Sequence, residues 1–306
     1  MLDAVFVLGP TASGKTALGI EIAKKIPAEV ISIDSALVYR QMDIGTAKPT
    51  LEEMAGVVHH LIDVRDPFES YSAADFVRDA TRLIKEIQSR GKLPLIVGGT
   101  MLYAKALKEG LNQMPTSDLD VRREVEAEAA EIGWPGMHAK LAEVDPVTAE
   151  RLMPNDAQRI SRALEVYRQT GKPISWYQAQ EQQGSDFKFL TLGLLPGERK
   201  ALHDRIAKRF DIMLKQGFLD EVKTLMAMPQ FDRLWPSMRA VGYRQAIDYL
   251  LGEIDYDRFV LAGVAATRQL AKRQMTWMRS MEDIHLMDPL TEDVVSRSLE
   301  VITQHR

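Results

Sequence analysis

The chain has 306 residues, 45% of them hydrophobic and 27% charged, which predicts one large or two modest globular domains and excludes collagen-like and disordered chains. It contains no cysteine, which excludes disulfide scaffolds, cysteine-based metal sites and a thiol nucleophile and fits a reducing cytoplasm, where we expect the protein. Because the formal net charge is −4, a polyanionic partner would have to bind a local basic patch.

A phosphate-binding loop follows the first predicted strand, residues 4–8. The loop has the pattern G-x-x-x-x-G-K-[ST] and consists of Gly9, Pro10, Thr11, Ala12, Ser13, Gly14, Lys15 and Thr16. Because a helical pattern follows over residues 17–26, this is the strand, loop and helix context of a P-loop. Its backbone N–H groups and the helix N-terminus would hold a polyphosphate, with Lys15 on the outer phosphate and the Thr16 hydroxyl on Mg²⁺. The apolar run stops at Gly9, so neither a signal peptide nor a membrane span is expected.

Two further predicted strands end in an aspartate. Residues 28–33 read as a buried strand that leads into Asp34. Since ligands of parallel α/β sheets bind beyond the carboxyl ends of the strands, Asp34 should face the same space as Lys15. The alternative is that Asp34 caps a helix over residues 36–41. Asp63, after a third short strand, is either a metal residue acting through water or an ordinary turn residue.

The next helix and strand lead to a second glycine-rich turn. Residues 72–75 resemble a capping box, and the apolar stripe after them predicts a helix that stops at Gly91. The strand predicted over 93–97 runs into Gly-Gly-Thr at 98–100, which either approaches a ligand closely or is a common turn. A motor ATPase would carry an Asp-Glu pair at the end of this strand. Because this strand ends in glycine, the sequence disfavours ATP hydrolysis as the function.

Beyond residue 112 the alternation of strands and helices stops. Residues 113–186 read as helices separated by prolines and glycines, which predicts a helical insertion domain on a core formed by residues 1–112 and 187–306. Arg159 and Arg162 lie three residues apart and therefore share a helical face, which is either a basic contact surface or simply solvated.

After the insertion the chain is predicted to return to the sheet with a strand over 187–194. A long amphipathic helix follows, and its projecting cations are Arg205, Lys208 and Arg209. These cations either point at the phosphate site or are surface charges. A later helix over 267–278 carries a basic stripe with no acid among residues 267–280. Trp277 in this helix is expected to be a core residue.

Taken together, seven segments resemble the bacterial tRNA dimethylallyltransferases, also called tRNA isopentenyltransferases. In order from residue 9 to about residue 279 they are GPTASGKT, VISIDSALVYRQMDIGTAKP, HHLIDV, LPLIVGGTMLY, NDAQRISRALEVY, MRAVGYRQ and ATRQLAKRQMTWMR. Any P-loop protein could supply the first segment, whereas the conjunction is far more specific. The resemblance implies an α/β fold with a P-loop NTPase-like parallel sheet flanked by helices, and an insertion domain that contacts the tRNA anticodon stem-loop.

The resemblance also implies the reaction. A dimethylallyl group would pass from dimethylallyl diphosphate to N6 of adenosine 37 in tRNAs reading codons that begin with U, giving N6-isopentenyladenosine. The P-loop would hold the diphosphate leaving group, with Mg²⁺ as cofactor, and the protein is expected to act as a monomer. The implied catalytic residues are Asp34 as general base, Lys15, Thr100 and Arg209.

The same resemblance implies a path for tRNA. It is lined by Asp34, Ser35, Ala36, Leu37, Thr100, Arg122, Arg123, Gln158, Arg159, Ile160, Ser161, Arg162, Arg239, Gly242, Tyr243, Arg244, Lys272, Arg273, Gln274 and Arg279. Leu37 departs from the family pattern, because many relatives carry Gln there. Two rival classes share the loop: a small-molecule kinase, and a nucleotide-switch protein that only senses ATP or GTP.

Overall fold

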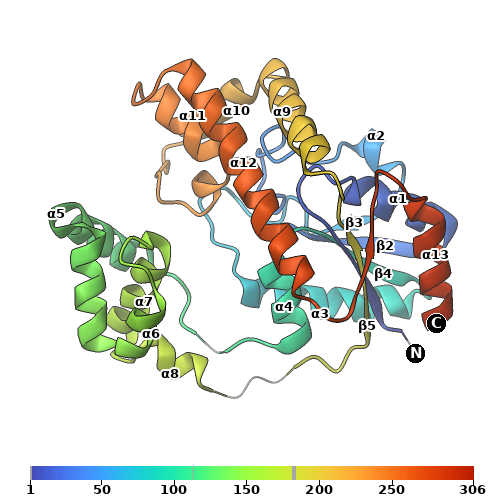
Figure 1. Cartoon of the computed structure of the whole chain (residues 1–306), viewed down its shortest axis with the longest axis horizontal. Coiled ribbons are helices and arrows are strands. Elements are labelled where there is room, and N and C mark those ends of the chain that lie inside the picture. Colours follow the sequence, from blue (N-terminus) through green and yellow to red (C-terminus); the bar gives the residue numbers. More distant parts are fainter. Residues whose placement is uncertain (1, 113, 181–183) are drawn as a thin grey trace. The chain divides into compact units, whose positions relative to one another are not determined.

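The computed structural model describes residues 2–112, 114–180 and 184–306 (Figure 1). The chain divides into two compact units, which we call the sheet unit (Met1–Lys108 and Ser185–Arg306) and the insertion unit (Glu109–Gly184). Residue 113, with which the insertion was predicted to begin, lies outside the described residues.

The sheet unit is built on one parallel sheet. Across it the described strands follow the order β3, β2, β4, β1, β5, β6, and every pairing is parallel. The strands are β1 (Ala4–Leu8), β2 (Ala28–Ile33), β3 (His59–His60), β4 (Leu93–Gly98), β5 (Phe189–Leu194) and β6 (Ile284–Met287). The predicted α/β class with a parallel sheet is confirmed. The third strand is shorter than expected, and the edge strand β6 was not predicted.

The register of this sheet brings three predicted site segments to one edge. Gly98, the last residue of β4, pairs with Leu8 at the end of β1 and with Ile33 at the end of β2. Because the three strands are parallel and end at the same level, the residues after them leave the sheet together. The P-loop, Asp34 and Thr100 therefore start from neighbouring points.

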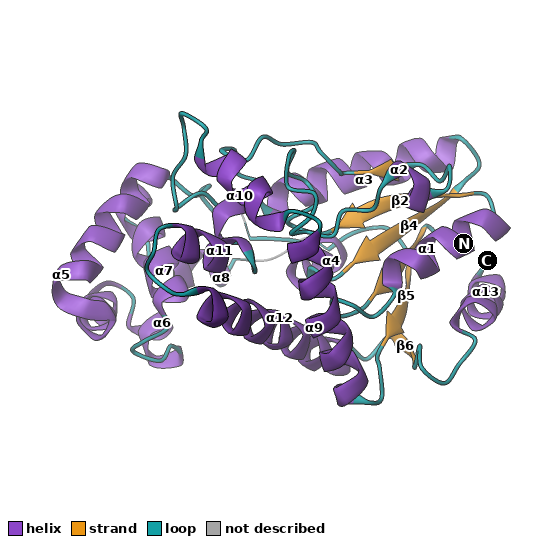
Figure 2. Ribbon diagram, turned by 90° about the horizontal axis from the view of Figure 1, so that it is seen from above, coloured by secondary structure: helices purple, strands orange, loops and turns teal. Residues whose placement is uncertain are grey.

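Helices cover both faces of the sheet (Figure 2). They are α1 (Lys15–Lys25), α2 (Leu51–Met54), α3 (Ala73–Ser89), α4 (Met101–Glu109), α9 (Arg199–Lys215), α10 (Phe218–Met226), α11 (Tyr243–Leu250), α12 (Tyr256–Arg279) and α13 (Val294–His305), with a 3₁₀ turn at Ser237–Arg239. Alternate strand residues such as Val5 and Val7 share a buried cluster with Ile22 of α1 and Val301 of α13. Helix α3 begins at the predicted capping box of Ser72 and packs against β2 and β4 from the other face.

Two local expectations are wrong. Residues 36–41 form turns instead of a helix, and Asp34 caps the first turn by accepting the N–H of Ala36 at 2.9 Å. Trp277 is 37% exposed because it lies outside the buried stripe of α12, which includes Met275 and Met278. Because residues 36–41 form no helix, Asp34 is not a helix cap, and the alternative prediction is that it faces the same space as Lys15.

The insertion unit is helical and has a core of its own. Its helices are α5 (Leu119–Val144), α6 (Pro146–Arg151), α7 (Ala157–Thr170) and α8 (Ile174–Gln178). Helix α5 is interrupted at Gly133, whose φ of 73° lies in the left-handed region. Side chains including Val125, Leu141, Ile160 and Val166 form the buried cluster. In neither unit do the described residues include a helix long and apolar enough to cross a bilayer.

Candidate active site

The P-loop presents the open N-terminus of α1. Gly14, the residue before the helix, has a φ of 92°, which favours glycine. No side chain caps this helix end within the described chain, so its first N–H groups are available to an anion. The loop is tightly packed, since a β-carbon on Gly9 would lie 2.4 Å from Oγ of Ser13.

A cavity of about 160 Å³ opens beside this loop in the sheet unit. Its polar end includes Lys15, Thr16, Asp34 and Arg209. The apolar side chains that line it include Ile206, Phe210, Met213, Phe218, Val241 and Leu270. A ligand that carries a phosphate group at one end and a small hydrocarbon at the other would match both kinds of surface.

Two half-buried cations share the polar end with one carboxylate. Burial lowers the pKa of Lys15 to about 8. The negative charge of Asp34 opposes this shift, and the positive charge of Arg209 adds to it. Burial also lowers the pKa of Arg209, against the raising effect of Asp34. The Arg209 guanidinium lies 3.4 Å from both the Thr11 hydroxyl and the Thr46 carbonyl oxygen. An anion in the cavity would compensate for the desolvation of both cations.

Asp34 and Thr100 are joined through the backbone between them. The N–H of Ser35 donates to Oγ1 of Thr100 at 3.1 Å, and the N–H of Thr100 donates to the carbonyl of Ile33 at 3.2 Å. Asp34 is half-buried and lines the cavity with Lys15. Asp34 therefore caps a turn instead of a helix, and it lines the cavity that contains Lys15.

Gln274 of α12 contacts the P-loop and lines the cavity. It is 8% exposed, accepts the N–H of Thr11 at 2.9 Å and donates to the carbonyl of Gly99 at 2.9 Å. The amide thus connects α12 to two of the turns at the sheet edge. The resemblance implied Gln274 as an RNA contact; in the structure it lines the cavity, and its amide bonds to two backbone groups of the sheet unit.

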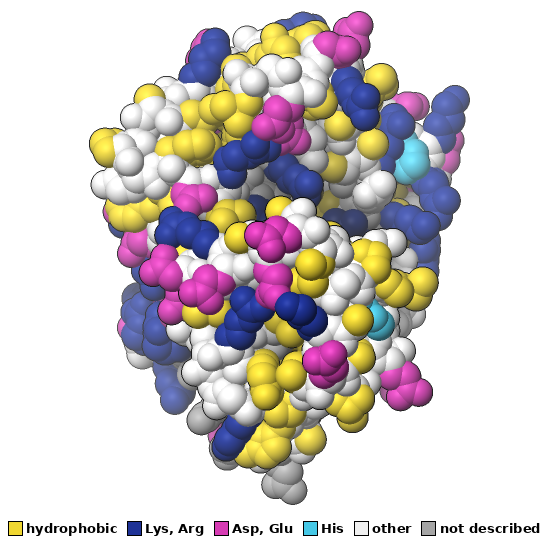
Figure 3. Space-filling model, turned by 90° about the vertical axis from the view of Figure 1, so that its left-hand side faces the viewer, with side chains coloured by type: hydrophobic (Ala, Val, Ile, Leu, Met, Phe, Trp, Pro, Cys, Tyr) yellow, Lys and Arg dark blue, Asp and Glu magenta, His cyan; other side chains and the backbone are white. Residues whose placement is uncertain are grey.

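The other predicted RNA residues differ in exposure. In the sheet unit the exposed ones are Ser35, Arg239, Arg244, Lys272, Arg273 and Arg279, while Gly242 and Tyr243 are buried. In the insertion unit Arg123, Gln158 and Arg159 are exposed, while Ile160 and Ser161 are buried. On the face in Figure 3 the Lys and Arg side chains are interspersed with acidic and hydrophobic ones.

Two predicted RNA-binding arginines of the insertion unit are held by a buried acid. Glu165 is 0% exposed, and Arg122 and Arg162 lie 3.4 and 3.2 Å from its carboxylate. Glu165 also accepts the N–H of Asp118 at 2.9 Å. Both guanidinium groups therefore compensate a buried charge, a role that the helical spacing did not indicate.

Asp63 forms an ion pair with Lys48 and does not line the cavity. Its Oδ1 atom lies 2.5 Å from Nζ of Lys48, and it is not among the cavity-lining residues. Nor do the described residues contain a group of three or more His, Asp or Glu arranged to hold a metal. Thr16 is exposed at the start of α1 and lines the cavity.

The lowered pKa of Lys15 predicts a pH dependence. The protonated amine binds an anion better than the neutral amine, so kcat/KM for a diphosphate substrate should be flat below pH about 8 and fall up to about tenfold per pH unit above it. Bound diphosphate should raise the Lys15 pKa, and kcat should therefore fall only at higher pH. Rates measured from about pH 7 to about pH 10 test this; a kcat/KM that stays flat over that range would contradict it.

A family model described as IPP transferase matches residues 37–281. Among curated proteins, the chain is 61% identical over 284 residues to a tRNA dimethylallyltransferase of Chromobacterium violaceum, covering 92% of this chain and 87% of that one. It is 57% identical over 300 residues to a protein of the same name from Janthinobacterium sp., covering 97% and 96%.

Solved structures are similar over almost the whole chain. A full-length tRNA isopentenylpyrophosphate transferase from Bacillus halodurans is 40% identical with a TM-score of 0.71, covering 98% of this chain and 94% of that one. A eukaryotic dimethylallyltransferase, described as acting on tRNA, is 28% identical with a TM-score of 0.79, covering 99% and 79%. Their likeness extends to both units described above.

Proposed function

The chain belongs to the IPP transferase family, and from this premise we propose that it transfers a dimethylallyl group from dimethylallyl diphosphate to N6 of adenosine 37 in tRNA. The acceptors proposed are tRNAs that read codons beginning with U, and the product is N6-isopentenyladenosine. We further propose a monomeric enzyme that works in the cytoplasm, where its tRNA substrate lies. The single observation that carries the proposal is a cavity with a P-loop at one end and an apolar lining beyond it.

The donor would bind with its diphosphate at the polar end. The open N-terminus of α1, Lys15 and Arg209 supply donors and positive charge where the C–O bond breaks and charge collects on the leaving group. These groups are prearranged, so they stabilise that charge without reorganising. The hydrocarbon would lie against the apolar lining of the cavity, to which Phe210 and Leu270 contribute.

Asp34 is proposed as the general base. The exocyclic amine of adenine is a weak nucleophile because its lone pair is delocalised, so a carboxylate that takes its proton while the C–N bond forms would speed transfer. Asp34 lines the cavity beside Lys15, and its turn is fixed by the contact between Ser35 and Thr100. Thr100 would therefore hold the segment that carries the base.

Mg²⁺ is proposed as cofactor. The chemistry of the described residues fits a magnesium ion bound mainly through substrate phosphates and water, because Thr16 is exposed at the cavity and no carboxylate cluster accompanies it. When bound, the ion would neutralise charge on the diphosphate. Thr16 is the residue proposed to hold it.

The tRNA would meet exposed cations of both units. Those proposed are Lys272, Arg273 and Arg279 with Arg239 and Arg244 in the sheet unit, and Arg123 and Arg159 in the insertion unit. Adenine cannot react while stacked in the anticodon loop, so we expect the base to be flipped out to reach Asp34. Glu165 would keep Arg122 and Arg162 in place in the insertion unit.

A transfer assay tests the proposal. The protein is incubated with unmodified tRNA, dimethylallyl diphosphate and Mg²⁺, and nucleosides are analysed by mass spectrometry. We expect adenosine to gain one five-carbon unit without added ATP. A requirement for ATP, with its consumption, would favour the kinase or the nucleotide-switch protein instead.

A further inference from the structure

One wall of the donor cavity is an irregular loop, residues 42–48, which we call the 42–48 loop. The cavity-lining residues that it supplies are Gly45, Thr46 and Ala47. A β-carbon on Gly45 would lie 2.2 Å from the Phe218 ring and 2.6 Å from the Tyr243 ring. The backbone of the loop therefore lies directly against these rings, and a small outward movement would open this side of the cavity.

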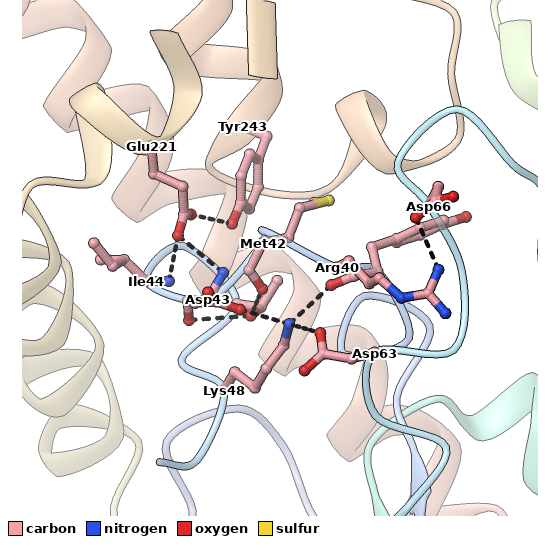
Figure 4. A network of polar contacts seen from close by, with 11 residues as sticks. Arg40, Met42, Asp43, Ile44, Lys48, Asp63, Asp66, Glu221 and Tyr243 are labelled. Atoms are coloured by element: carbon pink, nitrogen blue, oxygen red, sulfur yellow. Dashed lines mark hydrogen bonds and ion pairs between the residues drawn. The ribbon is translucent and has the colours of Figure 1, made fainter. Parts of the chain in front are cut away.

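Glu221 of α10 holds the beginning of this loop (Figure 4). Its Oε2 atom accepts the N–H groups of Asp43 at 2.9 Å and Ile44 at 2.7 Å. Its Oε1 atom accepts the N–H of Gly45 at 3.1 Å and the hydroxyl of Tyr243 at 2.5 Å. Hydrogen bonds to a carboxylate are about twice as strong as neutral ones, so four donors on one side chain make a strong attachment.

Lys48 holds the other end of the 42–48 loop. Its side chain is 7% exposed, and Nζ donates to the carbonyl of Tyr39 at 2.8 Å and to carboxylates of Asp43 at 2.6 Å and Asp63 at 2.5 Å (Figure 4). The N–H of Asp63 in turn donates to the carbonyl of Leu37 at 3.1 Å. The loop is thus tied to the segment that follows Asp34.

The loop also contacts a cation of the site. One terminal guanidinium nitrogen of Arg209 donates to the carbonyl of Thr46 at 3.4 Å, and the other donates to the Thr11 hydroxyl at 3.4 Å. Glu221 is not among the described residues that line the cavity. Any effect of Glu221 on the donor must therefore pass through the groups that it holds, which are the backbone of the loop and Tyr243, a residue that also lines the cavity.

We propose that Glu221 is a positioning residue, which fixes the 42–48 loop against the cavity and thereby sets the affinity for the allylic diphosphate. This inference rests on the proposed function for the identity of the donor. It assigns Glu221 no contact with donor, tRNA or reacting atoms.

The test is Glu221→Gln, which keeps the size of the side chain. It removes the charge and places an NH₂ group against backbone N–H donors. We expect the Kd for dimethylallyl diphosphate, measured by calorimetry, to rise about tenfold or more, with the Kd for tRNA unchanged. Hydrogen exchange of a peptide covering the 42–48 loop should become faster while exchange elsewhere stays as in the wild type.

Asp220→Asn is the matched control, because Asp220 precedes Glu221 on the same helix and its exposed carboxylate pairs with Lys223 at 3.0 Å. It should leave both measurements unchanged. Tyr243→Phe removes one of the four donors and should weaken donor binding in the same direction by a smaller factor.

Either of two results would overturn the inference: an unchanged donor Kd in Glu221→Gln, or exchange that speeds up throughout the chain, which would make Glu221 a general stability residue. Should Glu221→Gln fail to fold, an unchanged donor Kd in Tyr243→Phe would also overturn it. A wild-type protein that binds the donor but transfers nothing to tRNA would refute the proposed function, and the comparison of donor Kd values would still test the role of Glu221.

Discussion

Asp34→Asn should reduce the single-turnover rate of prenyl transfer by about 10²- to 10⁴-fold, the range that a positioned general base contributes. Asparagine keeps the oxygen that accepts the N–H of Ala36 at 2.9 Å, so the turn after β2 should persist. What is lost is a group able to take the proton of the adenine amine beside Lys15. The rate is measured with both substrates saturating, and tRNA affinity by filter binding.

Asp66→Asn serves as the control, because Asp66 is an exposed carboxylate paired with Arg40 outside the cavity lining. It should transfer at the wild-type rate. If Asp34→Asn lost tRNA binding but kept its single-turnover rate, Asp34 would be an RNA contact and could not be the base.

Lys15→Met should lower the transfer rate by about 10²- to 10³-fold, the cost typical of removing one electrostatic contact to a developing anion. Methionine retains the length and apolar stem of the side chain but has no charge to offer the departing diphosphate. Affinity for inorganic pyrophosphate should fall as well. The fall of kcat/KM above pH about 8 should disappear in this variant, since that titration belongs to Lys15.

Lys25→Met is the matched substitution at the far end of the same helix, where the side chain is exposed. It should behave as the wild type. Pyrophosphate affinity within a few-fold of the wild type in Lys15→Met would show that the P-loop amides hold the leaving group alone.

The Lys48 and Glu221 contacts illustrate what sequence patterns miss. No sequence pattern singles out Glu221, yet its carboxylate holds the N–H groups of Asp43, Ile44 and Gly45. Hydropathy and spacing describe neighbours on one element, whereas this carboxylate meets a loop more than 170 residues earlier in the chain. The glycine at position 45 was the available signal, since only it fits against the two rings.

In the insertion unit, too, tertiary contacts decide the role of charged residues that the sequence pattern left open. Arg122 and Arg162 were predicted as RNA contacts, and each lies against buried Glu165. A cation counts toward a basic surface only if no buried acid lies within its reach, and that depends on how α5 and α7 pack. Exposed Arg159 meets that condition, since the acid it pairs with at 2.7 Å, Asp156, is only partly buried.

The sequence by itself determined the parallel α/β class, the P-loop after β1 and the strand ends that carry Asp34 and Thr100. These features are local: hydrophobic periodicity, turn residues and the first helical turn are set within a few residues of one another. Only the tertiary structure placed Gln274 on Thr11, Arg209 beside Asp34 and Glu221 behind the cavity wall. Those contacts join distant parts of the chain, and they form because packing brings together groups that each need a partner once water is removed.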